Sequence, residues 1–179
     1  KNIPVIFAAV TYPVETGIID SLNYSGNNFV GTRNYISPIR QLSVFESIHP
    51  EIKSMAFVHR KGEPNSKIQF NEFKQLFEKM GMNLIDIEAI DIEDIKSQLE
   101  EKSNEFDSVY AACDTLIQTG GGKIVIDFSK KYKKPSFACL ENDVRRGALI
   151  GNVANIDEIG KIAGEKTALI LEGALPTWV

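Results

Sequence analysis

The fold is decided by the stretch Ser54–Met80, SMAFVHRKGEPNSKIQFNEFKQLFEKM. It opens with a short apolar run of the length of a buried strand, followed by a polar turn. Apolar residues then recur with helical spacing, at i, i+3, i+4 and i+7: Phe73, Leu76, Phe77 and Met80. Gly81 follows in the position after a helix that favours glycine. The stretch therefore predicts a strand over 54–59 and a helix over 64–80, which together make one βα unit.

The same alternation of strand and helix patterns continues on both sides of this unit. Further strands are predicted over 3–10, 28–33, 83–87, 108–113, 135–139 and 148–153. Further helices are predicted over 13–22, 38–48, 92–99, 123–132 and 156–171. Such alternation is typical of an α/β fold with doubly wound, mostly parallel sheets covered by helices on both faces.

The alternation also suggests two lobes, and a chain of 179 residues suits one large domain or two small ones. The βα pattern is complete between Ser54 and Cys139 and is flanked by shorter βα pieces. The chain is expected to cross between lobes near 35–38 and near Gly147. We therefore predict part of a first lobe in 1–35, a complete α/β lobe in 36–147, and a strand and helix in 148–179 that return to the first lobe.

The charge of the chain argues against two classes of partner, and its hydropathy argues against a membrane span. The net charge is −4 and no long block of like charge occurs, which argues against nucleic acid or an anionic membrane surface as the main partner. The short basic run Lys130–Lys134 lies where a helix is expected to end, where it complements the helix dipole. No apolar stretch reaches the roughly 18 residues of a membrane span.

The cysteines and histidines do not form a recognisable metal or cofactor motif. Cys113 and Cys139 are too few for a disulfide framework, and a buried free cysteine is the more common state. Whether the two cysteines pair stays open. His49 and His59 are too isolated to have metal-ligand spacing. We predict neither a metal nor a cofactor.

The glycine-rich stretch Gln118–Lys123, QTGGGK, departs from a phosphate-binding loop. The pattern G-x-x-x-x-G-K-[ST] needs glycine where this chain has Ile117, and serine or threonine where it has Ile124. We therefore interpret the three glycines as a loose start to the following helix.

Polar residues follow the predicted strands, where ligands bind in open parallel sheets. Thr11 follows the first strand, and Glu63, Asn65 and Ser66 follow the strand over 54–59. Later strands are followed by more acidic and hydroxyl side chains: Asp114, Thr115, Glu141 and Asp143. Because parallel strands end at one edge of a sheet, these groups are expected along that edge.

Two interpretations of these residues remain open. Pro64 suits the first turn of a helix, and Asn65 and Ser66 could cap it. The same helix start could instead bind a carboxylate or phosphate through free N–H groups. Asp114 could bind an ammonium group or a hydroxyl, or cap the helix that follows it. An anion-binding helix start close to acidic side chains would suit a zwitterion such as an amino acid.

Several short motifs, in order along nearly the whole chain, point to a known family. The most specific are Glu63–Ser66, EPNS, which opens a helix, and Arg145–Leu149, RRGAL, before a returning strand. The others are IPVIF at 3–7, PV at 13–14, the glycine-bounded segment 26–31, QL at 41–42, CDT at 113–115 and LEGALP at 171–176. With these motifs the chain resembles the ABC transporter substrate-binding proteins, in the group of tryptophan- and other aromatic-amino-acid-binding lipoproteins.

The resemblance implies a type I periplasmic-binding-protein-like fold, with two α/β lobes and a ligand cleft between them. Such proteins close like a hinge, pass a small-molecule ligand to a membrane permease and are not enzymes. The resemblance also implies an extracytoplasmic location, often with a lipid anchor. By the same resemblance, Asn65 and Ser66 would hold a ligand carboxylate and Asp114 an amino group. Weaker candidates for the cleft are Thr11, Glu63, Thr115 and Glu141.

The chain departs from the family pattern at three places. The family usually begins with a signal sequence and the first half of its first lobe, so this chain resembles a fragment. Exposed edges in a partial lobe make a homodimer plausible. The family commonly has Thr-Asp-Pro-Val where this chain has Thr11-Tyr12-Pro13-Val14, and Gly151–Asn155 replaces a more acidic and aromatic turn.

Two other functions are kept as alternatives. The same fold could serve as the ligand-sensing domain of a regulator. A small α/β enzyme is the third hypothesis, in which Cys113 would be a nucleophile beside His59, since both residues end predicted strands.

Overall fold

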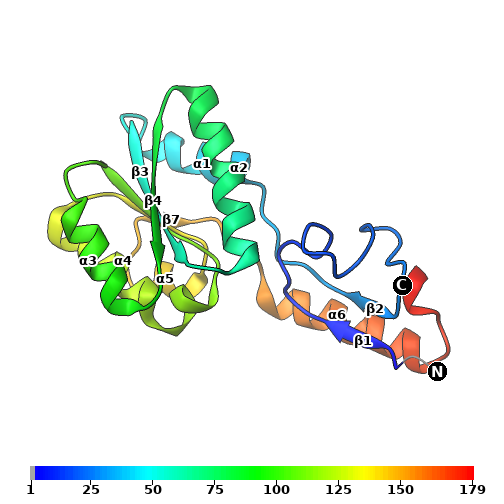
Figure 1. The fold of residues 1–179 in the computed structure, drawn as a ribbon. Coiled ribbons are helices and arrows are strands. Elements are labelled where there is room, and N and C mark those ends of the chain that lie inside the picture. The colour runs from blue at the N-terminus through cyan, green and yellow to red at the C-terminus, as the bar shows by residue number, and fades with distance from the viewer. Residues whose placement is uncertain (1–2) are drawn as a thin grey trace. The chain divides into compact units, whose positions relative to one another are not determined.

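The computed structural model describes residues 3–179 and divides into two units (Figure 1). The larger unit is Ile36–Val153, and the smaller unit combines the chain up to Tyr35 with Ala154–Val179. No helix in the described residues is both long and apolar enough to cross a membrane.

The described residues of the larger unit form a parallel sheet in the order β4-β3-β5-β6-β7. Its strands are β3 (Ser54–Arg60), β4 (Asn83–Ala89), β5 (Ser108–Ala111), β6 (Ser136–Ala138) and β7 (Ile150–Gly151). The chain enters at β3, adds β4 on one side, and then returns to add β5, β6 and β7 on the other side. The direction of winding therefore reverses between β3 and β5, which makes this the topological switch point of the sheet.

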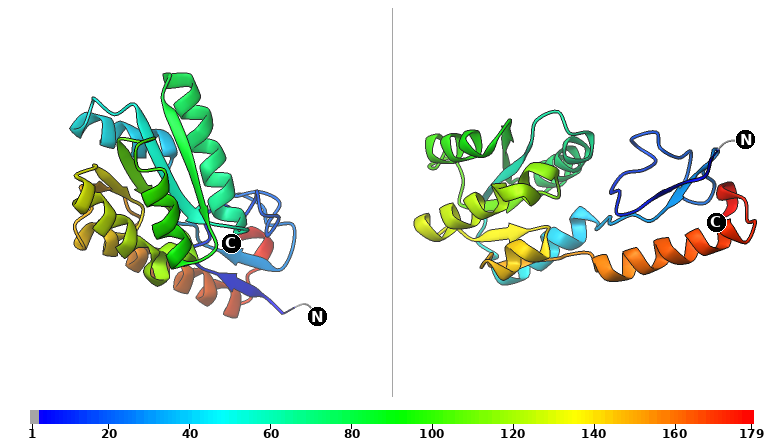
Figure 2. Two further views of the ribbon diagram at one scale, coloured as in Figure 1. Left: turned by 60° about the vertical axis from the view of Figure 1, so that its left-hand side comes forward. Right: turned by 90° about the horizontal axis from the view of Figure 1, so that it is seen from below.

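Helices cover both faces of this sheet (Figure 2). Along β3, Ala56 and Val58 face a core with α3 (Ile92–Glu101) and α4 (Gly122–Tyr132). Met55 and Phe57 face the opposite core, with α1 (Pro38–Ile48) and α2 (Pro64–Met80). All four side chains are at most 1% exposed. A strand buried on both faces explains the continuous apolar run in the sequence.

The predicted helix over 64–80 coincides with α2, and Gly81 ends it in the left-handed region at φ 69°. The predicted loose helix start is a kinked helical turn, η1 (Ile117–Gly121), which precedes α4. Gly120 in this turn has φ 140°, a conformation that a side chain would strain. A Cβ on Gly122 would lie 2.4 Å from the Asp143 carboxylate, so close packing also requires glycine at the start of α4.

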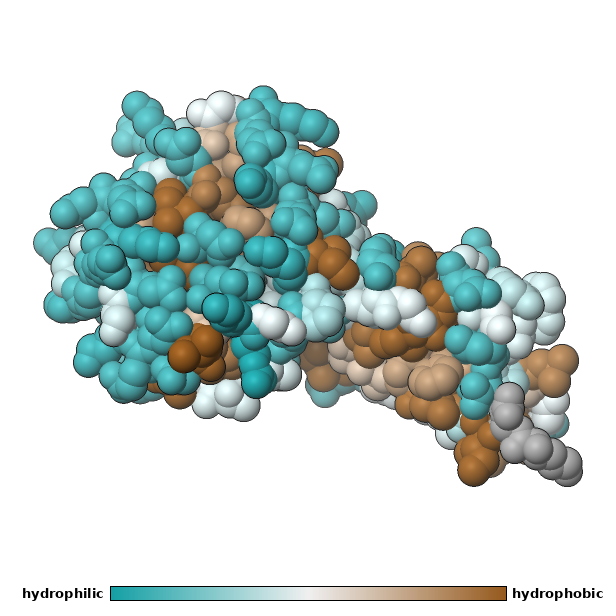
Figure 3. Space-filling model, viewed as in Figure 1, coloured by the Kyte–Doolittle hydropathy of each residue, from teal (hydrophilic) through white to brown (hydrophobic). Residues whose placement is uncertain are grey.

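The described part of the smaller unit pairs β1 (Val5–Phe7) with β2 (Phe29–Gly31) in parallel. The helix α6 (Ile156–Leu171) and the 3₁₀ turn η2 (Pro176–Trp178) complete it. Strands were predicted at both places but over longer ranges. On the face seen in Figure 3, apolar side chains gather over this unit, whereas the larger unit is mostly hydrophilic.

Two predictions are corrected here. The predicted helix over 13–22 is wrong, because this segment consists of turns and bends and Gly17 adopts φ 74°. A left-handed residue at that point stops any helix that begins at Pro13. The strand predicted within 148–179 was expected to return to the first lobe. Instead β7 pairs with β6, so residues 148–153 belong to the larger unit and only α6 and η2 lie in the smaller one.

Candidate functional site

The candidate site lies at the carboxyl ends of β3 and β5, at the switch point of the larger sheet. β3 ends at Arg60 and leads through a turn into α2. β5 ends at Ala111 and leads through Asp114 and Thr115 into the kinked turn η1. Because the two strands are neighbours, the residues that follow them meet at one edge.

Asp114 joins these two chain segments. Its Oδ2 accepts a hydrogen bond from the Arg60 backbone N–H at 2.8 Å, and its Oδ1 accepts one from Ile117 N–H at 2.9 Å. The side chain is 1% exposed. Burial raises the pKa of Asp114 above its ordinary value, while the two backbone hydrogen bonds act in the opposite direction. Asp114 therefore caps the turn that follows it, as one of the two sequence interpretations predicted, and it also ties that turn to β3.

Ser66 is anchored to the same strand end. Its hydroxyl lies 3.2 Å from the carbonyl oxygen of Arg60 and 3.1 Å from that of Glu63. It is 1% exposed, so the Ser66 side chain packs at the base of the helix start. Because a hydroxyl has one hydrogen and two lone pairs, Ser66 can still accept a hydrogen bond while it donates to one carbonyl.

The start of α2 keeps free backbone donors. Lys67 N–H donates to Glu63 C=O at 3.2 Å, and Pro64 has no N–H. The N–H groups of Asn65 and Ser66 therefore lack partners within the helix. Glu63 is the N-cap residue, but its side chain makes no capping bond. The prediction that side chains of this stretch cap the helix is therefore wrong.

The Glu63 side chain reaches across to β5 instead. Its Oε2 accepts hydrogen bonds from Thr115 Oγ1 at 2.7 Å and from Thr115 N–H at 3.3 Å. The guanidinium of Arg60 donates to the same threonine hydroxyl. Sequence reasoning missed Arg60, although its place as the last residue of a strand was the signal that could have found it.

Four of the predicted residues thus come together, and three do not. Glu63, Ser66, Asp114 and Thr115 share one hydrogen-bond network through Arg60. Asn65 is at the helix start, and its Oδ1 is buried without a hydrogen-bond partner among residues 3–179.

The other two predicted residues lie elsewhere. Glu141 is exposed after β6, where it accepts a hydrogen bond from Arg145 Nε at 2.9 Å. Thr11 belongs to the smaller unit, where its hydroxyl donates to Asn34 Oδ1 at 2.8 Å. Within the larger unit, Glu141 therefore stands apart from the network around Arg60.

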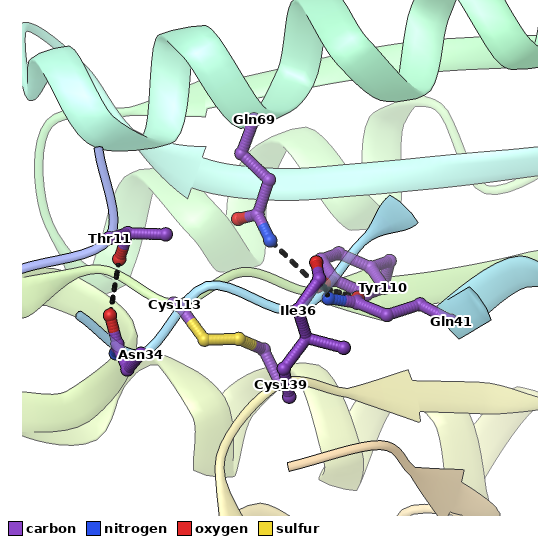
Figure 4. Close-up of a disulfide and its surroundings, with 8 residues drawn as sticks. All are labelled: Thr11, Asn34, Ile36, Gln41, Gln69, Tyr110, Cys113 and Cys139. Atoms are coloured by element: carbon purple, nitrogen blue, oxygen red, sulfur yellow. Dashed lines mark hydrogen bonds between the residues drawn. A yellow bond between two sulfur atoms is a disulfide. The ribbon is translucent and has the colours of Figure 1, made fainter. Parts of the chain in front are cut away.

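The two cysteines form a disulfide, which Figure 4 shows, and Cys113 directly precedes Asp114 of the network in the chain. Cys113 follows β5 and Cys139 follows β6, and their Cα atoms are 5.4 Å apart. The sequence left this pairing open; the neighbouring strands β5 and β6 bring the two residues together at the sheet edge. The hypothesis of a Cys113 nucleophile beside His59 is wrong, because a cysteine in a disulfide has no free thiol.

His59 is paired elsewhere, with an acid on the adjacent strand. The ring is fully buried and its Nε2 lies 2.8 Å from Asp86 Oδ1. Partial burial acts to raise the pKa of Asp86, but the hydrogen bond and charge of His59, with Lys67, outweigh it and lower that pKa overall. Within residues 3–179 no cluster of three or more histidine, cysteine, aspartate and glutamate side chains could hold a metal ion.

A buried chain of hydrogen-bonded side chains connects α1, α2 and β5, and sequence reasoning missed it as well. The Tyr110 hydroxyl donates to Gln41 Oε1 at 2.6 Å and accepts from Gln69 Nε2 at 3.0 Å (Figure 4). Gln41 Nε2 in turn donates to Ile36 C=O at 3.1 Å. Burial raises the pKa of Tyr110, so this hydroxyl stays protonated. These bonds fix α1, α2 and β5 relative to one another within the larger unit.

The chain has the periplasmic-binding-protein-like α/β fold, with polar groups gathered at the switch point of a parallel sheet. The family model described as "ABC transporter substrate binding protein" matches residues 1–179. The chain belongs to this family.

Its relatives include proteins with stated amino acid ligands. A tyrosine-binding protein from Clostridioides difficile (strain R20291) is 30% identical over 173 residues, which cover 97% of this chain and 50% of the relative. The ABC domain from Streptococcus pneumoniae solved in complex with L-Trp superposes with a TM-score of 0.92 at 26% identity. A conserved domain protein from Vibrio cholerae superposes with a TM-score of 0.93 at 27% identity. This chain is covered completely in both superpositions but spans 60% of each of those structures, and about half of the curated relative.

Proposed function

We propose that this chain forms part of the solute-binding component of an ABC importer. Its ligand is a small zwitterion, an aromatic amino acid such as tyrosine or tryptophan, which binds at the switch-point edge of the larger unit and is passed on without catalysis to a membrane permease. The observation that carries the proposal is the network of Arg60, Glu63, Ser66, Asp114 and Thr115 at the switch point. Support for the ligand class comes from the tyrosine-binding and L-Trp-bound relatives.

The groups at this edge match the two charges of a zwitterion. The free N–H groups of Asn65 and Ser66 lie at the positive end of the α2 dipole, which favours a carboxylate. The Arg60 guanidinium, which donates to Thr115, adds a cation at the same edge of the sheet. Glu63 and Asp114 supply carboxylate oxygens that can accept hydrogen bonds from an ammonium group. Thr115, held between Arg60 and Glu63, keeps the two kinds of group in place.

We also propose an extracytoplasmic location. The Cys113–Cys139 disulfide supports it, because disulfides persist in oxidising compartments and are rare in the cytosol of most organisms. Family membership supports the same location, since substrate-binding proteins work where they meet the solute before the permease does.

The test is calorimetric titration of L-tyrosine and L-tryptophan into the native protein that contains this chain. Ser66→Ala removes a hydroxyl that can accept from the ligand's ammonium group, and Asp114→Asn removes a carboxylate that can do the same. Each change should weaken binding by about 1.5–3 kcal/mol, the usual effect of losing a hydrogen bond to a charged group. Ser97→Ala and Asp127→Asn are matched controls at exposed positions of α3 and α4, and both should bind like the unmodified protein. Unchanged affinity in both site variants would remove this site assignment.

A further inference from the structure

The disulfide lies just past the end of the main-chain pairing of β5 with its two neighbours, β3 and β6. The last ladder bonds at this edge run from Ala112 N–H to Val58 C=O at 3.1 Å and from Cys139 N–H to Ala111 C=O at 3.2 Å. Cys113 is the next residue after Ala112, and Asp114 follows it directly. The covalent link between Cys113 and Cys139 therefore connects β5 and β6 directly after their last main-chain hydrogen bond.

The segment after this link is irregular only up to Asp114, because the chain is helical from Thr115 onward. The helical stretch that Asp114 leads into is interrupted by a kink within η1 before it continues as α4. Gly120 within it lies far outside helical backbone angles. Yet Asp114 must sit accurately, because its two oxygens accept from Arg60 and Ile117 at 2.8 and 2.9 Å.

The disulfide supplies a covalent anchor at the first residue of this turn. Cys139 is 5% exposed and belongs to the same core as Phe137 and Tyr110. Cys113 is thus fixed to a well-packed strand end. Its neighbour Asp114 can then hold Arg60 N–H without support from a longer ladder.

We propose that the Cys113–Cys139 disulfide is a positioning element of the ligand site, which holds Asp114 and Thr115 against Arg60 and Glu63. The inference rests on the proposed function for its ligand, an aromatic amino acid, but the positioning itself can be measured without ligand. The two cysteines do not contact the ligand in this account; they act through the turn that carries Asp114.

The ligand-free test is amide hydrogen exchange in the native protein and in the Cys113→Ala/Cys139→Ala variant. The Arg60 and Ile117 amides both donate to Asp114, and both should exchange faster in the variant. Val125→Ala is the matched control, because Val125 is fully buried in α4, in the core on the other face of the sheet. The two variants are compared at temperatures at which they have the same global free energy of unfolding. Under these conditions the Arg60 and Ile117 amides should stay protected from exchange in Val125→Ala. Equal protection in the cysteine variant would overturn the proposal.

The ligand test uses L-tyrosine and L-tryptophan with the same proteins. The cysteine variant should bind several-fold more weakly, while Val125→Ala binds like the unmodified protein. In an Asp114→Asn background the cysteine substitutions should cause no further loss, because their effect acts through Asp114. A full additive loss in that background would overturn the proposal. If the unmodified protein binds neither amino acid, the proposed function is wrong. The exchange rates of the Arg60 and Ile117 amides then still show whether the disulfide positions the turn.

Discussion

The two units of this protein differ in how well they bury their own apolar surface. In the larger unit, α1 and α2 cover one face of the sheet while α3 and α4 cover the other, and side chains such as Phe57 and Val109 are fully buried. In the smaller unit, the sheet described consists of β1 and β2, each three residues long. Ile3, Leu171 and Trp178 there are 80%, 83% and 71% exposed.

This difference indicates where the stability of the chain resides. A pair of short strands is marginal by itself, whereas a sheet with a core on both faces can fold independently. The network around Asp114 lies wholly in the larger unit, so its geometry is supported by that unit's own core. The comparison can be sharpened by changes that affect one unit and leave the other intact.

The largest contrast is expected between Phe57→Ala and Trp178→Ala. Phe57 has its ring centroid 4.8 Å from Tyr110, 5.2 Å from Phe73 and 5.6 Å from Phe70. Its removal should lower the free energy of unfolding of the larger unit by about 3–5 kcal/mol. Trp178 contacts Tyr24 at the surface, so its removal should change stability by about 1 kcal/mol or less. Urea unfolding followed by far-UV circular dichroism measures both values, and equal losses would break the comparison.

The sequence predicted the larger unit better than the smaller one for a physical reason. Strands buried on both faces give continuous apolar runs, and α2 combines an amphipathic repeat with Pro64 at its start and Gly81 at its end. The segment 13–22 has no such agreement between signals, and Gly17 at positive φ decides its turns.

The candidate site was predicted in its residue types but not in its connections. The rule that ligands bind after parallel strands found Glu63, Ser66, Asp114 and Thr115. The disulfide and the role of Arg60 depend on the strand order, because only the pairing of β5 with both β3 and β6 brings these residues together. A single sequence does not specify that order.

The next largest effect is expected from removing the disulfide. Cys113 and Cys139 are 26 residues apart, and a crosslink that closes a loop of this size stabilises a fold by about 3 kcal/mol. Cys113→Ala/Cys139→Ala should therefore lower the unfolding free energy of the larger unit by this amount. Trp178, the single tryptophan of the sequence, reports on the smaller unit by fluorescence. The midpoint of the unfolding transition seen by Trp178 fluorescence should be the same in the variant as in the unmodified protein. A shift of this midpoint together with that of the circular dichroism signal would show that the two units unfold together.

The smallest effect is expected at Asp86 and depends on pH. Its pKa is lowered in the folded protein, so its ionised form stabilises the fold above the ordinary value of 3.8. That stability is lost as the pH falls through the lowered pKa. Because Asp86 is 37% exposed, solvent screening limits the effect of Asp86→Asn to about 0.5–1 kcal/mol at neutral pH. Unfolding curves should differ at pH values above 3.8 and converge below it. A difference that persists in acid would contradict this assignment.

The most direct test of the central claim is residue-resolved amide hydrogen exchange of the native protein with and without L-tyrosine or L-tryptophan. We predict that bound ligand protects the free N–H groups of Asn65 and Ser66 at the start of α2, together with the turn from Asp114 to Ile117. Amides in α3 and α4, on the opposite face of the sheet, should stay unchanged. Saturating ligand that leaves the α2 start and the Asp114 turn unprotected, or that protects a different edge of the sheet, would contradict the proposed site.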